Sequence, residues 1–254
     1  MKRHKGKPCF VNLWSDDVHT PWVPRSETEF NGKFPMNPEE ETAFKGVLEE
    51  YDVQIGRLLD GLQEMGLSEN TIIIFTSDNG PAPSFRGSRS GGFRGAKASL
   101  YEGGIRMPFL VSWPGHIPAG KIDDRSVLHT TDLLPSLAKI AGITLPKNYS
   151  GDGLDQSELL LGKPASRNRD LYWEYGRNDI AYNFPKGRDR SPRLAIRSGD
   201  WKLLMDSDKS KIELYNIVKD SKETNNLMTT EPKMTAQLSE KLIVWWRSIP
   251  KLGA

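Results

Sequence analysis

The chain has 254 residues, 37% of them hydrophobic and 27% charged, which is typical of a soluble globular protein with a substantial core. Its 35 basic residues nearly balance 33 acidic ones, so the net charge of +2 points to neither a nucleic-acid nor a membrane partner. No apolar run approaches the roughly 20 residues of a membrane span, and no apolar export signal follows Met1. The single cysteine, Cys9, excludes an internal disulfide and leaves the cellular compartment open.

The first predicted element is a short buried strand from Cys9 to Trp14. It leads into the turn SDDVHTPWVP, which presents His19 two residues before Pro21. Asp16 and Asp17 are interpreted as turn residues.

The clearest helix is predicted from Asn37 to Gly66. Asn37 suits the N-cap, Pro38 suits the first turn, and the glutamates at 39–41 complement the positive end of the helix dipole. Gly66 is expected to end the helix. The apolar face repeats at helical spacing and consists of Phe44, Val47, Leu48, Tyr51, Ile55, Leu58, Leu59, Leu62 and Met65.

An uninterrupted β-branched and aromatic run from Thr71 to Thr76 predicts a strand buried on both faces of a parallel sheet. Together with the strand at 9–14 and the long helix it would form a βαβ crossover, whose two strands are parallel and share a sheet. Because the turns after such strands line one edge of the sheet, this geometry brings His19 and Asp78 together.

Asp78 and Asn79 directly follow this strand, and they offer a carboxylate and an amide oxygen to Ca²⁺ or Mg²⁺. Gly80 lets the backbone turn sharply behind them. Lys97 follows in a glycine-rich loop that also carries Arg86, Arg89 and Arg94. Alone, Asp-Asn-Gly also fits a plain turn and the cations also fit a solvated surface. The combination predicts a site for an anionic ester.

A further buried strand is predicted from Met107 to Trp113, and a helix is predicted from Thr131 to Ala141. His116 and His129 flank this part of the chain. Both are interpreted as structural or surface residues, because no second ligand lies at metal-binding spacing.

The pattern changes after a turn-rich stretch at 146–163. The segments LYWEYG, RLAIRSGDWKLLMD and IELYNI are short and nearly alternating, which predicts an antiparallel sheet, and a terminal helix is expected over 231–249. The chain is therefore divided into a partial α/β domain at 1–163 and a small α+β subdomain at 164–254.

The stretch SDNG followed by GGFRGAKASLYEGGIRMPFLVSWPG resembles a signature region of the sulfatases, of the arylsulfatase and N-acetylgalactosamine-6-sulfatase type, in the alkaline-phosphatase-like superfamily. The R-x-G-x-W-K and E-L-Y-N pieces of the small carboxyl-terminal subdomain match Arg197 to Leu204 and Glu213 to Asn216. The resemblance implies an α/β fold with a mostly parallel sheet flanked by helices, here incomplete, plus a small antiparallel sheet with a terminal helix.

The same resemblance implies a role for each candidate residue. Asp78 and Asn79 would ligate Ca²⁺, with Mg²⁺ as an alternative, and Lys97 would bind the sulfate. His19, in a His-x-Pro turn, would contact the sulfate or protonate the leaving group. Arg94 is counted with the substrate-binding residues, and both Arg94 and Arg106 are candidates for supporting contacts.

The family nucleophile is a formylglycine made within a C/S-x-P-x-R sequence, and this motif does not occur in the chain. Cys9 is followed by Phe-Val-Asn and cannot replace it. Two oxygen ligands are also few for Ca²⁺, which takes about six to eight. The chain alone is therefore expected to bind metal weakly and to hydrolyse sulfate esters poorly or not at all.

The expected function is sulfuric ester hydrolysis on a sulfated small molecule or a sulfated glycan, and the cationic loop favours a substrate with additional negative charge. Two alternatives stay open: a phosphoesterase of the same superfamily, and a non-catalytic carbohydrate-binding or partner-binding derivative of the fold. A periplasmic or secreted location is expected for a full-length protein, and the oligomeric state stays open.

Overall fold

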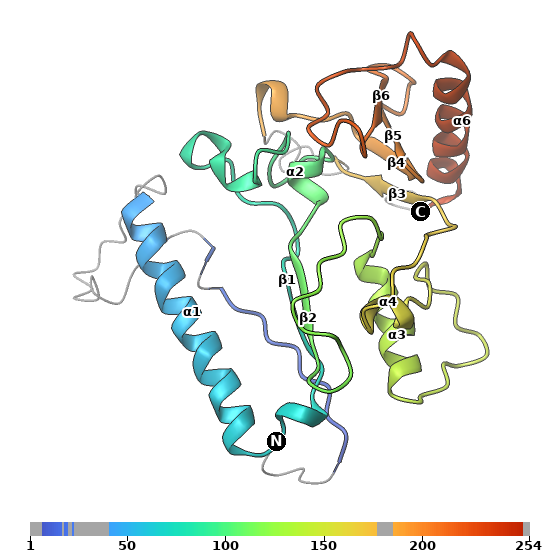
Figure 1. Ribbon diagram of the computed structural model, residues 1–254. Helices are drawn as coiled ribbons and strands as arrows, with labels where there is room; N and C mark the ends of the chain where they lie inside the picture. Colours follow the sequence, from blue (N-terminus) through green and yellow to red (C-terminus); the bar gives the residue numbers. More distant parts are fainter. Residues whose placement is uncertain (1–6, 17, 20–21, 23–40, 177–184, 251–254) are drawn as a thin grey trace. The chain divides into compact units, whose positions relative to one another are not determined.

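The computed structural model describes residues 7–16, 18, 19, 22, 41–176 and 185–250, which belong to two compact units at 1–68 and 69–254 (Figure 1). Within these ranges, no helix combines the length and the apolar character that crossing a bilayer requires.

The first unit is built on helix α1, Glu41–Glu64. The helix buries Ala43, Val47 and Leu62, whereas other positions of its predicted apolar face are partly exposed, among them Leu48, Leu58, Leu59 and Met65. Gly66 ends it in the left-handed conformation, with φ at 65°, as predicted. The predicted start at residues 37–40 lies outside the described residues.

The predicted buried strand at 9–14 is not formed. Residues 8–16 have no regular secondary structure, and Phe10 and Trp14 are 82% and 87% exposed. An apolar run becomes a strand only when a neighbouring strand satisfies its backbone hydrogen bonds. Residues 9–14 take part in neither of the two sheets of the described residues.

In the second unit, β1 (Ile73–Thr76) pairs with β2 (Phe109–Ser112), and the register sets Ile73 opposite Ser112. This pairing is antiparallel and uses one edge of β1. It does not decide the predicted parallel pairing with residues 9–14, which belong to the other unit, so that pairing stays a prediction. The predicted burial of β1 on both faces was wrong, because Phe75 is 39% exposed. The strand β2, also predicted to be buried, exposes 58% of Leu110. The predicted strand at 107–113 is confirmed over its central residues.

The predicted helix at 131–141 is confirmed as a 3₁₀ turn, Thr130–Asp132, that continues into α3, Leu133–Ile140. His129 caps it by accepting a hydrogen bond from the Thr131 N–H, which confirms a structural role. The short helix α4, Ser157–Leu160, follows within the turn-rich stretch. A domain boundary at 163 stays a prediction.

The carboxyl-terminal part is an antiparallel four-stranded sheet in the order β3-β4-β5-β6, as predicted. Its strands are Leu171–Glu174, Leu194–Ser198, Trp201–Met205 and Glu213–Asn216. Helix α6, Pro232–Ser248, packs on one face (Figure 1). That core contains Ile196, Leu203, Met205, Leu238 and Leu242.

The other face of the sheet packs against the glycine-rich segment. Ala195, Leu204 and Tyr215 form a second apolar cluster with Leu100 and Tyr101. Three short helices belong to the same region, namely η4 (Phe85–Ser90), α2 (Glu102–Ile105) and η6 (Gly187–Asp189). The small sheet therefore lies between helix α6 and the segment that carries Lys97.

Candidate active site

The end of β1 presents Asp78 and Asn79 on a hydrogen-bonded turn. The Ser77 hydroxyl donates to the Asn79 carbonyl at 3.0 Å, and the Asn79 side-chain N–H donates to the Gly80 carbonyl at 2.9 Å. The amide oxygen of Asn79 is thereby left as an acceptor, while the Asp78 side chain is exposed to solvent. Both oxygens are available for a ligand.

Gly80 connects this turn to the glycine-rich segment. Its N–H donates to the Gly104 carbonyl at 2.9 Å, and a Cβ at this position would lie 2.1 Å from the Gly103 carbonyl oxygen. Only glycine permits such an approach of two backbones. The Lys97 N–H donates to the Pro81 carbonyl at 2.7 Å. The structure therefore attaches the Lys97 backbone directly to the residues that follow the Asp-Asn pair.

The segment from Arg94 to Gly104, which we call the Lys97 turn, is tightly closed. The Gly103 N–H donates to the Arg94 carbonyl at 2.7 Å, and a Cβ on Gly104 would meet the Ser99 carbonyl oxygen at 2.0 Å. Ala98, directly after Lys97, has φ at 70° although it carries a side chain. A non-glycine residue in this conformation stores strain, of order 1 kcal/mol.

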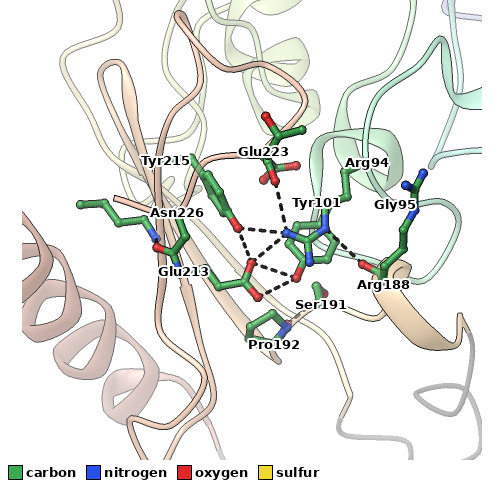
Figure 2. Close-up of polar contacts among 12 residues, drawn as sticks. Arg94, Gly95, Tyr101, Arg188, Ser191, Pro192, Glu213, Tyr215, Glu223 and Asn226 are labelled. Atoms are coloured by element: carbon green, nitrogen blue, oxygen red, sulfur yellow. Dashed lines mark hydrogen bonds and ion pairs between the residues drawn. The ribbon is translucent and has the colours of Figure 1, made fainter. Parts of the chain in front are cut away.

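Arg94 faces the carboxyl-terminal sheet (Figure 2). Its guanidinium donates to the Glu213 carboxylate at 3.1 Å, to the Tyr215 hydroxyl at 3.0 Å and to the Arg188 carbonyl at 3.1 Å. The guanidinium carbon also lies 3.7 Å from the centroid of the Tyr101 ring. These contacts show Arg94 joining the Lys97 turn to the sheet, and its role toward a substrate stays a prediction.

Two tyrosines complete this cluster around Glu213. The Tyr101 hydroxyl donates to the carboxylate at 2.9 Å and the Tyr215 hydroxyl donates to it at 2.6 Å. Burial, together with the negative charge of Glu213, raises the pKa of Tyr101 and of Tyr215 far above the ordinary value. Both phenols therefore stay protonated and keep donating to the carboxylate.

The other candidate cations also have partners. Arg106 pairs with Glu102 at 3.7 Å and its guanidinium lies 4.8 Å from the centroid of the Phe93 ring. Lys97 is half-buried in its turn.

Glu213 also lines a cavity of about 430 Å³ with Arg190, Lys211 and Asn226. None of the predicted site residues lines that cavity.

His19 belongs to the first unit. The backbone N–H of His19 donates to the Asp16 carbonyl at 3.0 Å, so Asp16 is a turn residue as predicted. His19 itself is exposed. Asp17 and Pro21 lie outside the described residues. The backbone bond from Lys97 to Pro81 places the Lys97 backbone beside the residues that follow Asp78 and Asn79. Convergence of these side chains with one another and with His19 stays a prediction.

The candidate metal ligands suit a hard cation in kind. A carboxylate and an amide oxygen are donors that Ca²⁺ and Mg²⁺ prefer, although Ca²⁺ takes about six to eight oxygens. The described part of the chain contains no group of three or more His, Cys, Asp or Glu side chains that could hold a metal ion. Asp78 and Asn79 therefore fit as part of a ligand set.

Four charged residues were not predicted from the sequence: Glu102 within the Lys97 turn, its partners Glu213 and Glu223 in the carboxyl-terminal part, and the buried amine of Lys202. Lys202 could have been noticed, because in W-K-L-L-M it shares strand parity with Leu204 and so falls on a buried face. No comparable strand pattern marks its partners Glu102 and Glu223 as buried.

Two family models match the chain, one described as Sulfatase over residues 1–143 and one described as N-sulphoglucosamine sulphohydrolase, C-terminal, over residues 93–246. The chain is 30% identical to the N-acetylgalactosamine-6-O-sulfatase of Bacteroides thetaiotaomicron, a match that covers 94% of this chain and 47% of the relative. It is 38% identical to human arylsulfatase A over 67% of this chain and 32% of that protein.

A solved structure from work on the metabolism of multiple glycosaminoglycans by Bacteroides thetaiotaomicron superposes with a TM-score of 0.73 at 29% identity. It covers 96% of this chain and 51% of its own. The chain thus spans about half the length or less of these relatives. With a family model matching more than half of its residues and the alkaline-phosphatase-like fold of its neighbours, the chain belongs to the sulfatase family.

Proposed function

We propose that the chain supplies the sulfate-binding turn and part of the metal-binding set of a sulfate monoester hydrolase. The observation that carries this proposal is the pair of backbone hydrogen bonds, Lys97 to Pro81 and Gly80 to Gly104, which tie the Lys97 turn to the Asp78-Asn79 strand end. Family membership supports sulfate ester hydrolysis as the chemistry, since the relatives are named sulfatases.

Each residue has a defined part in the proposal. The Lys97 ammonium binds a sulfate oxygen and stabilises the charge that develops on it during cleavage. Asp78 and Asn79 hold part of the coordination sphere of Ca²⁺ or Mg²⁺, which when bound supplies additional positive charge at the ester. His19 contacts the sulfate or protonates the leaving oxygen. Arg94 supports the substrate side of the turn.

The proposed substrate class is a carbohydrate or aryl sulfate. One relative is named for a carbohydrate sulfate and another as an arylsulfatase, and these names describe those proteins. The arginines of the glycine-rich segment favour a substrate with further anionic groups. A periplasmic or secreted location would give access to extracellular sulfated glycans, and fractionation of the native host would test it.

The direct test is calorimetric titration of the purified chain with inorganic sulfate. Lys97→Ala should weaken sulfate binding about tenfold or more, corresponding to loss of one charge-assisted contact. Lys139→Ala, on the exposed surface of α3, is the matched control and should leave the affinity unchanged. Equal binding by both variants would overturn the proposal for Lys97. Stronger binding of inorganic phosphate would favour the related phosphoesterase.

A second titration tests the metal ligands. Asp78→Ala should abolish the Ca²⁺-dependent rise in melting temperature, whereas Asp124→Ala, whose side chain is 86% exposed and pairs with Arg125, should keep it. Because no C/S-x-P-x-R motif occurs in the sequence, the purified chain should release no measurable product from a chromogenic aryl sulfate. Robust metal-dependent turnover would contradict this. Glycan binding that survives loss of both Asp78 and Lys97 would favour the non-catalytic alternative.

A further inference from the structure

Three ionisable side chains from distant parts of the chain meet in the interior, one from the Lys97 turn itself and two from the carboxyl-terminal part of the chain. The Lys202 ammonium lies 2.9 Å from a carboxylate oxygen of Glu102 and 2.9 Å from a carboxylate oxygen of Glu223. The exposed fractions of these side chains are 0%, 3% and 0%. We call these residues the buried ion cluster.

Strand geometry places Lys202 in this position. Side chains alternate between the two faces of a strand, so Leu203 and Met205 of β5 pack toward α6 while Leu204 packs toward Leu100 and Tyr101. Lys202 shares the parity of Leu204. Its amine therefore points from the small sheet toward the segment that contains the Lys97 turn.

The cluster is attached to the backbone of that segment. The second carboxylate oxygen of Glu223 accepts a hydrogen bond from the Glu102 N–H at 2.7 Å, at the start of α2. The Gly95 N–H donates to the Asp189 carboxylate at 3.3 Å, and the Leu100 N–H donates to the Ser191 hydroxyl at 2.8 Å. These two hydrogen bonds connect the same segment to the residues before β4. The Lys97 turn is thus held from the carboxyl-terminal subdomain at several points along its length.

The charges of the cluster are not matched one to one, since two carboxylates share one ammonium. Burial alone would raise the pKa of Glu102, but the adjacent Lys202 with Arg197 and Arg106 outweighs burial and lowers it. For Glu223, burial dominates the opposing effect of Lys202, and its pKa is raised. Replacing buried charges with well-packed apolar groups is often neutral or stabilising, so stability alone is a weak explanation for such a cluster.

The strained backbone beside Lys97 suggests a better explanation. Ala98 adopts φ at 70°, and Glu223 adopts φ at 54°. Strained conformations persist only where the surrounding structure over-determines them, and they gather at functional sites. Here the surroundings are the buried ion cluster and the neighbouring hydrogen bonds of the small sheet.

We propose that Lys202, acting through Glu102 and Glu223, is a positioning residue that holds the Lys97 turn in its sulfate-binding conformation. The inference rests on the proposed function of Lys97. It gives the carboxyl-terminal subdomain a definite part in the site, because the residue that would bind sulfate is fixed by Lys202 of β5, 105 positions later in the sequence.

The test compares the full chain with a charge-free triple variant, Glu102→Gln, Lys202→Met and Glu223→Gln. Removing all three charges together avoids an unpaired buried charge, so the melting temperature should stay near that of the parent chain. Amide hydrogen exchange at residues 96–104 should nevertheless accelerate about tenfold, and sulfate affinity should fall about tenfold. The control Lys209→Met removes an exposed pair with Glu240 and should change neither quantity.

A spectroscopic readout separates positioning from stability. The NMR signal of the Lys97 ε-methylene, assigned by its loss in Lys97→Ala, should shift on addition of inorganic sulfate in the parent chain and much less in the triple variant. A folded triple variant with parental exchange and sulfate response would overturn the inference. If the triple variant does not fold, Glu223→Gln gives the same readouts, expected to change about threefold, and no change in them would also overturn it.

The proposed function and this inference can fail separately. Unchanged sulfate binding in Lys97→Ala would refute the function of Lys97, while faster exchange confined to 96–104 would still support positioning by Lys202. Lost binding in Lys97→Ala combined with an unaffected triple variant would support the function and refute the positioning role.

Discussion

The guanidinium of Arg94 donates a hydrogen bond of 3.1 Å to the carboxylate of Glu213, which lies 119 positions later in the sequence. Both side chains are mostly buried, and Tyr101 and Tyr215 donate to the same carboxylate (Figure 2). This contact links the most distinctive stretch of the sequence to the small carboxyl-terminal sheet. The two parts are thus one structural unit around the Lys97 turn.

Arg94→Lys should destabilise the protein although it conserves the charge. Lysine lacks the planar fork that reaches Glu213, Tyr215 and the Arg188 carbonyl together, and it loses the stacking on Tyr101. We expect the free energy of unfolding to fall by about 2 kcal/mol, measured by urea denaturation. The control Arg125→Lys alters a side chain that is 94% exposed and should stay within about 0.5 kcal/mol. An Arg94→Lys chain as stable as that control would contradict the assignment.

Two glycine-to-alanine substitutions should have opposite effects. At Gly80 a Cβ would lie 2.1 Å from the Gly103 carbonyl oxygen, so Gly80→Ala should cost about 2 kcal/mol or more and disturb the Lys97 turn. At Gly61, in the interior of α1, a Cβ meets nothing within 4 Å. Gly61→Ala should therefore stabilise by about 0.5–1 kcal/mol, because alanine loses less backbone entropy in a helix. Thermal unfolding monitored by circular dichroism would measure both, and a gain in stability at Gly80 would refute the close approach.

Ala98→Gly should relieve the strain next to Lys97. Alanine at φ 70° carries a penalty that glycine does not, and this outweighs the extra chain entropy of glycine, for a net gain of about 0.5 kcal/mol. Ala138→Gly, in helix α3, should lose about 1 kcal/mol by the same assay. A loss of stability in both variants would show that Ala98 is not strained.

His129 should make the stability depend on pH. Burial lowers its pKa below the ordinary value of 6.5, and Arg167 acts in the same direction against Asp132. The unfolded chain therefore binds the proton more readily, and the contribution of His129 is complete above pH 6.5 and declines as the pH falls through 6.5 toward the lower folded value.

Asparagine is a good helix cap that does not titrate, so His129→Asn should keep the helix start and remove this dependence. Urea denaturation at about pH 7.5 and about pH 5.5 should show a smaller decrease for the variant than for the parent chain. Equal decreases in the two proteins would exclude His129 as the source.

Local sequence patterns determined much of this protein. Local patterns predicted α1, α3 and α6, with Gly66 as the end of α1, and the alternating segments predicted the four-stranded antiparallel sheet. The Asp-Asn-Gly turn after β1 was also identified correctly in place. These features depend on residues within a few positions of one another, so a single sequence contains the information.

Only the tertiary structure decided which segments meet. A strand-forming run does not specify its partner strand, and the antiparallel pairing of β1 with β2 was not indicated by the sequence pattern. Strand parity indicates that Lys202 points inward, but 33 acidic residues could in principle pair with it. The choice of Glu102 and Glu223 is made by the packing of the Lys97 turn on the sheet. Attraction between two charges depends on their distance in space and not on their separation along the sequence. Chain topology and close packing therefore select the partner of Lys202.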